Sequence, residues 1–287
     1  MRIRLRTCTI VFALVATALA ADLEVPAHVV AHSPLVISTS GEGNGTLYIV
    51  GPVARIRRVV RLGDQVQFEP AEIGASGFYT AVLAGGGFSV SKTFFVAPGE
   101  PRRLSFLAQP SRVPTDVKDV ISGTVFVRDG DDNLVLAPLP VTFELAVAGA
   151  SSATRTVETH EGVAWSQIDS SRRAGNAQFT ASSDGVSVRR VVQQTAAEPC
   201  DLRFHAQLAK GNIRVETDQV RDCSGNAVPD GTVVSFTELA PQGRSTVDAV
   251  VKNGVARAIL PNAPQATLSV ASGVVGGNEI RWNGGFQ

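Results

Sequence analysis

The stretch DCSGNAVP at residues 222–229 has a counterpart earlier in the chain, at residues 129–138. Both copies begin with Asp, have Asn four positions later and end on Pro. The two aspartates, Asp129 and Asp222, are 93 residues apart. Since a pattern that recurs at about one domain length is typical of tandem modules, this stretch predicts one fold made at least twice.

The residues on either side of the two copies repeat in the same order. VSF and GVA follow the later copy, and VTF and GVA follow the earlier one. The offset is 92 residues at Gly162 and Gly254, and 98 residues at Phe106 and Phe204. An offset that steps only between such anchor points indicates that differences in length are confined to loops.

The spacing of apolar residues predicts an all-β protein. Val, Thr and Ser recur in short alternating runs, with turn residues about every eight to twelve positions, which is typical of a β-sandwich. Gly85, Gly86 and Gly87 separate two such runs and predict a hairpin, because glycine accepts a positive φ. No long run has the apolar period of a helix. The expected fold class is three tandem immunoglobulin-like β-sandwich domains after a signal peptide.

The domain boundaries are expected where Pro and Gly interrupt the apolar runs, near residues 97–101 and 194–199. Each resulting segment is close to the roughly 100 residues of an immunoglobulin-like sandwich. The predicted parts are a signal peptide at 1–20 and sandwich domains at 21–97, 101–194 and 199–287.

The first residues have the pattern of a secretory signal. Arg2, Arg4 and Arg6 precede an apolar stretch at residues 9–19, and small residues at 18–20 suit a signal peptidase. The alternative, a membrane anchor, needs about 20 apolar residues, and this stretch is shorter. No later stretch predicts a membrane span. We therefore expect an exported protein of the periplasm, the cell surface or the medium.

The order of the repeated motifs resembles the bacterial Ig-like group 1 domains of invasin- and intimin-type proteins. The later copy carries the resemblance best, through DCSGNAVP, VSF and GVA, and the earlier copy matches more loosely. The resemblance covers residues 101–287. It implies rigid sandwich modules of surface or secreted proteins, stacked as spacers that display a binding tip. The segment at 21–97 has only the general sandwich pattern.

Cys200 and Cys223 are the cysteines that remain after removal of a signal peptide. Lys210, Gly211 and Asn212 lie midway between them and predict the turn of a hairpin, which would place the two thiols side by side. An exported protein can oxidise them. A redox or metal pair would need a Cys-x-x-Cys spacing or nearby histidines, and neither is present. We expect a structural disulfide.

Residues 129–133, DGDDN, resemble the start of a calcium loop. An EF-hand loop needs Gly at its sixth position and Glu at its twelfth, where this chain has Leu134 and Pro140. The EF-hand interpretation therefore fails, although an adventitious calcium site between domains stays open. Since Asp, Asn and Gly also form turns, we expect a solvated turn without a metal.

Arg55, Arg57 and Arg61 fall on one face of a predicted strand, and Arg58 falls on the other. Two interpretations are open. The three arginines form a basic stripe that binds an anionic envelope glycan or a protein, or they protect an exposed sheet edge from aggregation. We favour edge protection, because charged edges are common and the formal net charge is zero.

Motifs that carry chemistry are missing from the sequence. His28, His32, His160 and His205 are not spaced as metal ligands, and no nucleophile elbow, phosphate loop or dinucleotide fingerprint occurs. We therefore predict no catalytic residues, no metal site and no cofactor. Trp165 and Trp282 are expected to pack in cores or between domains, and the balanced charge gives no reason to expect a nucleic-acid partner.

The sequence thus predicts an exported, non-enzymatic structural or interaction protein built of tandem Ig-like modules, of the cell-envelope or adhesin-spacer type. The alternative is a specific glycan- or protein-binding module that uses the arginine face of the first domain.

Overall fold

A computed structural model describes residues 21–150 and 152–284. The predicted signal peptide at residues 1–20 lies outside these residues. The described chain consists of strands and loops, apart from one short 3-10 turn at Pro70–Glu72. It contains no helix that is long and apolar enough to cross a membrane. The prediction of an all-β fold is confirmed.

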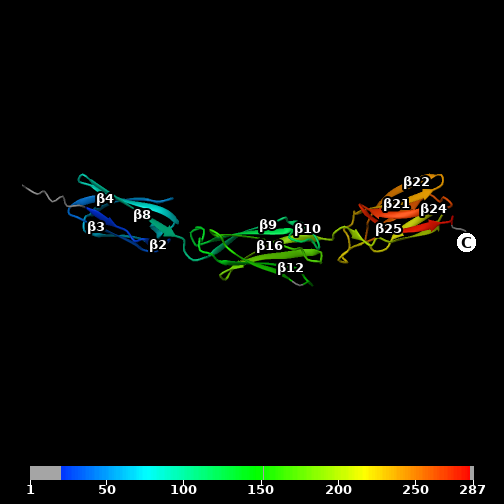
Figure 1. Cartoon of the computed structure of the whole chain (residues 1–287), viewed down its shortest axis with the longest axis horizontal. Helices are drawn as coiled ribbons and strands as arrows, with labels where there is room; N and C mark the ends of the chain where they lie inside the picture. Colours follow the sequence, from blue (N-terminus) through cyan, green and yellow to red (C-terminus); the bar gives the residue numbers. More distant parts are fainter. Residues whose placement is uncertain (1–20, 151, 285–287) are drawn as a thin grey trace, which may run out of the picture. The chain divides into compact units, whose positions relative to one another are not determined.

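The first sandwich consists of two sheets with strand orders β1-β3-β6 and β2-β8-β7-β4-β5 (Figure 1). The predicted glycine hairpin joins β7 and β8, and Gly86 and Gly87 have φ values of 52° and 88°. Its strands are β1 (Asp22–Glu24), β2 (His28–Val30), β3 (Leu35–Ser40), β4 (Asn44–Val50), β5 (Arg55–Arg61), β6 (Gln65–Phe68), β7 (Gly77–Gly85) and β8 (Phe88–Ala97).

The second sandwich has sheets β10-β16-β15-β12-β13 and β14-β11-β9. Its strands are β9 (Arg103–Gln109), β10 (Arg112–Pro114), β11 (Ile121–Arg128), β12 (Pro140–Ala146), β13 (Ala153–Glu158), β14 (Val163–Ile168), β15 (Gly175–Ser183) and β16 (Val186–Thr195).

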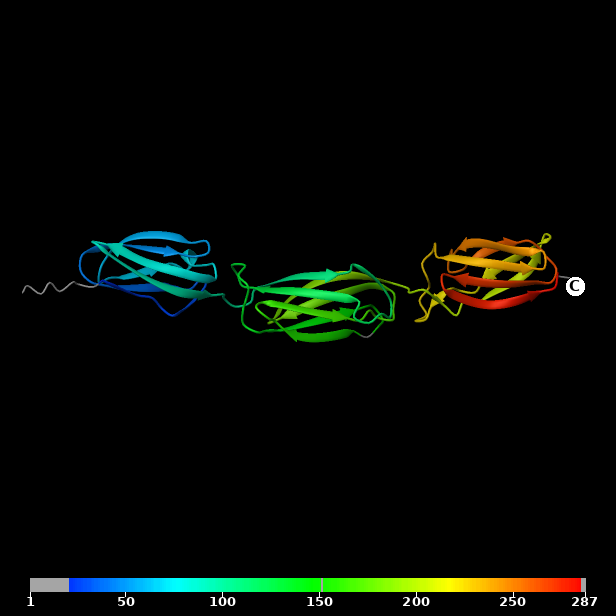
Figure 2. The same cartoon turned by 45° about the horizontal axis from the view of Figure 1, so that its top comes forward.

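The third sandwich has sheets β18-β19-β23 and β22-β21-β24-β25, with a two-stranded ladder β17-β20 at its start. Figure 2 shows the two facing sheets of each sandwich from a second direction. The strands of the third sandwich are β17 (Pro199–Cys200), β18 (Phe204–Ala209), β19 (Asn212–Thr217), β20 (Arg221–Asp222), β21 (Val233–Ala240), β22 (Gly243–Val250), β23 (Arg257–Leu260), β24 (Ala266–Ser272) and β25 (Val275–Trp282).

Each sandwich encloses its own apolar core between its two sheets. The phenylalanines that repeat in the sequence are buried, as their alternation with polar neighbours predicts. In the second sandwich three phenylalanine rings meet above Gly123 of β11, where a Cβ atom would lie 2.8–3.0 Å from the rings of Phe106, Phe143 and Phe179. Glycine is therefore needed at this position for the core to close.

Three further aromatic residues show how side chains pack in the sandwiches. Tyr79 is fully buried in β7, and its hydroxyl donates to the carbonyl of Ala75 at 2.8 Å, as in the tyrosine corner of many sandwiches. The expectation for Trp165 is wrong, because its side chain is 57% exposed. Ala164 faces the core, so the next residue along β14 must point outward. Trp282 does pack against the third core, and its indole donates to Asn262.

The chain divides into two compact units. The first comprises the chain up to Glu100 together with Asp129–Asn133, and the second comprises Pro101–Arg128 and the chain from Leu134 onward. The small segment Asp129–Asn133 thus leaves the strands of the second sandwich and belongs to the first unit. It is the earlier copy of the motif that repeats in the sequence.

Candidate functional site

The earlier copy of the motif is a turn organised by Asp129, which follows directly after β11. Its Oδ1 accepts the backbone N–H groups of Asp131 and Asn133, both at 2.9 Å. The side-chain amide of Asn133 donates to its Oδ2 at 2.9 Å. We refer to this arrangement, Asp at the first position and Asn at the fifth, as the Asp–Asn turn.

The later copy folds in the same way at the end of β20. Oδ1 of Asp222 accepts the backbone N–H groups of Ser224 at 3.0 Å and Asn226 at 2.8 Å. The Asn226 amide donates to Oδ2 at 2.8 Å. Since local Asp and Asn hydrogen bonds depend only on spacing along the chain, equal spacing in the sequence gives equal turns.

Both aspartates are buried, whereas residues 130–132 at the tip of the first turn are exposed, so the expectation of a solvated turn holds for the tip and is wrong for Asp129. Asp129 is 2% exposed and Asp222 is 4% exposed. A carboxylate is seldom buried to this degree unless it is well hydrogen-bonded. The spacing of Asp and Asn predicted the turn correctly, but the choice between solvent and protein depends on groups far away in the sequence.

The first Asp–Asn turn bonds the linker after β8 and a loop of the first sandwich, all within the first compact unit. The N–H of Gly99 donates to Oδ2 of Asp129 at 2.8 Å. Asn133 makes a two-way contact with the loop before β7, because its Oδ1 accepts from the N–H of Ser76 and its Nδ2 donates to the carbonyl of Gly74, both at 2.8 Å.

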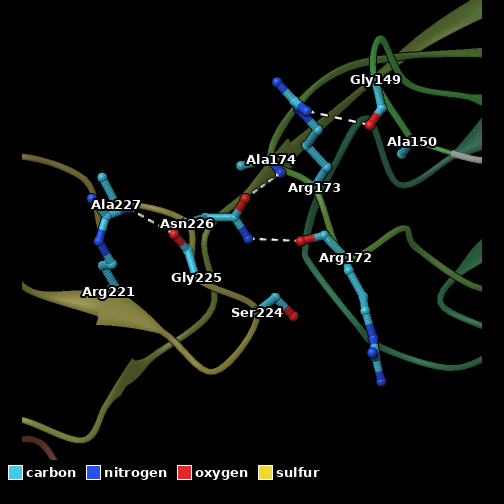
Figure 3. A pocket seen from close by; sticks show the side chains of 10 residues that line it. All are labelled: Gly149, Ala150, Arg172, Arg173, Ala174, Arg221, Ser224, Gly225, Asn226 and Ala227. Carbon is cyan, nitrogen blue, oxygen red and sulfur yellow. Dashed lines mark hydrogen bonds between the residues drawn. The ribbon is translucent and has the colours of Figure 1, made fainter.

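The second Asp–Asn turn makes the matching contacts with the second sandwich, within the second compact unit. Oδ2 of Asp222 accepts from the N–H of Ala197 at 3.1 Å and from the hydroxyl of Thr115 at 2.7 Å. Asn226 again bonds a loop in both directions, accepting from Ala174 at 2.9 Å and donating to the carbonyl of Arg172 at 2.8 Å (Figure 3). This loop precedes β15, as the partner loop in the first unit precedes β7.

Each Asp–Asn turn is therefore a clasp, by which we mean that it bonds the linker and a loop of the sandwich that precedes it in the sequence. Burial alone would raise the pKa of both carboxyls, but hydrogen bonds outweigh it. Those of Asn133 and Gly99 hold the pKa of Asp129 below its usual value, and those of Asn226 and Thr115 do so for Asp222. Both carboxyls are thus ionised at neutral pH.

The disulfide predicted from the sequence lies directly beside the second clasp. Cys200 and Cys223 are bonded, with Cα atoms 5.0 Å apart. Strands β18 and β19 form the predicted hairpin, with Lys210 and Gly211 at its turn. The cysteines lie outside these strands: Cys200 pairs with Arg221 in the β17–β20 ladder and Cys223 follows β20, so the register at Cys200 is two residues from the expected one. Closing a loop of this length contributes about 3 kcal/mol to the stability of the third sandwich.

An open crevice of about 630 Å³ lies around Asn226 (Figure 3). Three arginines line it, but their guanidinium groups do not converge. Arg172 and Arg173 point in opposite directions, and Arg173 donates to the carbonyl of Gly149. Arg221 donates to the carbonyl of Gly225. The crevice thus holds the hydrogen bonds of the clasp and offers no set of groups for acid–base or nucleophilic chemistry.

The structure places the arginine stripe on β5, at the edge of the larger sheet of the first sandwich. Arg55, Arg57 and Arg61 are exposed. Arg58 points the other way, where its guanidinium bonds both carboxylate oxygens of Glu72 at 2.7 Å and lies 4.4 Å from the Phe68 ring centre. The predicted division of the four arginines between two faces is therefore observed.

The histidines do not come together. His28 lies on β2, and His32 follows in a turn where its Nδ1 is 2.9 Å from Asp131 of the first clasp. Within residues 21–150 and 152–284, no group of three or more His, Cys, Asp or Glu side chains is placed to hold a metal ion.

The fold is that of several solved structures. FdeC, an Escherichia coli adhesin, aligns with 96% of this chain and 100% of its own, at 14% identity and a TM-score of 0.64. InvD of Yersinia pseudotuberculosis aligns with 94% of this chain and 98% of its own, at 13% identity and a TM-score of 0.55. Invasin, a bacterial integrin-binding protein, aligns with 92% of this chain and 60% of its own, at 13% identity and a TM-score of 0.51.

No protein-family model and no curated protein matches the chain. The structural likeness, at such low identity, concerns the fold. It confirms the fold implied by the sequence resemblance, that of the Ig-like repeats of invasin-type proteins.

Proposed function

We propose that this chain is an exported, non-enzymatic protein of the adhesin type, in which tandem Ig-like sandwiches act as a spacer that displays binding surfaces at a fixed distance. The observation that carries this proposal is the clasp. The bonds of the clasp reach beyond its own sandwich, to the linker and to a loop of the sandwich before it, so they oppose bending between modules.

The second clasp supports the mechanical role most directly. It joins the third sandwich to the linker at Ala197, to Thr115 near β10 and to the loop at Arg172. The two bonds to the Asp222 carboxylate are charge-assisted, and such hydrogen bonds are stronger than neutral ones. Bending about the linker would break several at once and leave a buried carboxylate without donors.

A double electron–electron resonance measurement tests the spacer. Nitroxide labels at Glu144→Cys and Glu279→Cys, both exposed, report the distance between the second and third sandwiches. We expect one narrow distance distribution, which broadens in Asn226→Ala. Asn176→Ala is the matched control, because Asn176 is an exposed strand residue outside the clasp. A broad distribution in the otherwise unaltered chain would contradict the proposal.

Export is supported by the signal-like residues 1–20 and by the disulfide, which suits an oxidising compartment. Cell fractionation compares the full chain with a chain that begins at residue 21. We expect only the full chain to leave the cytoplasm and to carry the Cys200–Cys223 bond. Equal distribution of the two proteins would remove the export part of the proposal.

A further inference from the structure

The outward face of β5 combines positive charge with an unpaired strand edge. β5 is the last strand of its sheet, and β4 is its neighbour on one side only. Arg55, Arg57, Val59 and Arg61 project to the outer face, and Val59 is 71% exposed. An edge strand presents unpaired N–H and C=O groups along its free side, which is a template for one more strand.

Arg58, on the same strand, contacts other residues of its own sandwich. It bonds Glu72, contacts the Phe68 ring and donates to the carbonyl of Gln67 on the opposite sheet. By contrast, no described residue forms an ion pair with any of the three outward arginines. Three guanidinium groups of one strand are therefore available to a ligand.

The corresponding edge strands of the other two sandwiches differ. On β13 the outward Thr156 hydrogen-bonds Thr142 of the neighbouring strand at 3.0 Å. On β22 the outward Asp248 accepts from Ser235 at 2.6 Å. On these two edges polar outward side chains are hydrogen-bonded to the neighbouring strand. Since both serve as sheet edges without an arginine stripe, edge protection alone does not explain the stripe on β5.

Apolar side chains continue the surface from β5 toward the middle of the sheet. Tyr48 on β4 lies opposite Arg57, and Val50 lies opposite Arg55. Tyr48 is 37% exposed and Val50 is 49% exposed. Tyrosine and arginine together are characteristic of the residues that dominate binding at protein interfaces. The surface is therefore suited to a polypeptide.

We propose that β5 binds an extended, acidic segment of a partner protein, which adds to the sheet as a further strand. Strands in a sheet lie about 4.8 Å apart, and alternate side chains point to one face. A segment with carboxylates at alternate positions would therefore place them beside Arg55, Arg57 and Arg61. The same arginines repel a basic strand and gain nothing from a neutral one, so the edge selects its partner by charge. This inference goes beyond the proposed spacer and can fail without it.

Fluorescence anisotropy with the full chain and the labelled heptapeptide ETVTETE tests the proposal. In the antiparallel direction this peptide places Glu beside each arginine and Val beside Val59. We expect saturable binding that weakens as salt is added. The triple variant Arg55→Gln/Arg57→Gln/Arg61→Gln should bind about tenfold more weakly, since exposed ion pairs contribute modestly one by one.

Controls separate strand addition from simple charge attraction. Arg112→Gln/Arg189→Gln/Arg190→Gln changes the net charge equally with exposed arginines of the second sandwich, and should bind like the unaltered protein. The peptide EEETTTV has the same composition without the alternation, and should bind more weakly. A peptide N-methylated at those alternate amides that would face β5 should lose binding, because these amides can no longer donate to the carbonyls of β5.

Three results would overturn the proposal. One is equal binding of ETVTETE and EEETTTV, and another is undiminished binding of the N-methylated peptide. The third is binding of a sulfated oligosaccharide through the same arginines with no peptide binding, which would assign the stripe to an anionic glycan. Circular dichroism of both triple variants verifies that they fold, so a loss of binding reports on the surface.

Discussion

The two Asp–Asn turns have the same internal hydrogen bonds but differ in their contacts with the residues around them. In each, Asp bonds two backbone N–H groups of its own turn, and Asn bonds a backbone loop of the preceding sandwich in both directions. The second clasp has two additions, the hydroxyl of Thr115 on Asp222 and the disulfide at Cys223. At the third position of the turn, the first clasp has the exposed pair of Asp131 and His32, and the second has the hydroxyl of Ser224, which donates to Asp116 at 3.2 Å.

This comparison shows which residues of a clasp must be conserved between the two copies of the motif for the clasp to form. Apart from Thr115, the groups outside the turn that bond its Asp and Asn are backbone atoms, which almost any residue supplies. The loops at Gly74 and Arg172 therefore need no sequence in common, whereas Asp and Asn must recur at a spacing of four. The additions at the second clasp predict that it is the stronger of the two.

The largest effect is expected for Asp222→Ala. The change leaves buried N–H groups of the turn and the linker without an acceptor, and should destabilise the third sandwich by about 4 kcal/mol. Asp129→Ala should cost about 1 kcal/mol less, because no hydroxyl contacts Asp129. Calorimetry with resolved transitions, together with amide exchange at Asn226 and Asn133, measures both.

Two variants sharpen this prediction. Thr115→Val in the unaltered chain removes the added hydrogen bond and should bring the second clasp close to the first. Glu144→Ala, an exposed carboxylate outside both clasps, is the control and should change little. Equal losses for Asp222→Ala and Glu144→Ala would show that the clasps contribute no stability.

The next largest effect is expected for Cys200→Ser/Cys223→Ser. Loss of the covalent loop should lower the stability of the third sandwich by about 3 kcal/mol. The first sandwich has no disulfide in its described part and serves as the internal control, since its unfolding transition should be the same in the double variant and in the unaltered protein. A decrease in both transitions would indicate an effect other than loop closure.

Most of the fold could be predicted from the sequence, because it depends on local signals. Alternation gave the strands and the buried phenylalanines, glycines gave the hairpin of β7 and β8, and the position of Lys210 and Gly211 gave the disulfide pairing. Trp165 was mispredicted although its signal was present, since the buried Ala164 beside it fixes the outward direction.

The burial of the clasps could not be predicted in the same way. The turn is local, but its acceptors and donors at Gly74, Ser76, Arg172 and Ala174 are backbone groups, which leave no trace in side-chain identity. The available signal was the recurrence of Asp and Asn in both copies, at positions where a plain turn would tolerate many residues.

Acid should weaken both clasps, with a smaller effect than the substitutions at neutral pH. The pKa of each aspartate is lowered in the folded state. The unfolded chain therefore takes up protons first as the pH falls, and stability declines below about pH 4, toward and through the lowered folded pKa. Asp222→Asn should be less stable at neutral pH and should have a flatter acid profile. Urea unfolding at a series of pH values measures this, and parallel profiles for the two proteins would contradict it.

The smallest effect is expected for His32→Gln. The ring lies 2.9 Å from Asp131, but the two side chains are 52% and 33% exposed, so water competes for the interaction. Exposed ion pairs contribute about 0–1 kcal/mol. We expect the first sandwich to lose no more than about 0.5 kcal/mol, measured by the same calorimetry. A loss as large as that of Asp129→Ala would mean that the first clasp is held mainly by the exposed His32–Asp131 contact. The two clasps would then not be held by the same buried Asp and Asn, because the second clasp has Ser224 and Asp116 in place of this pair.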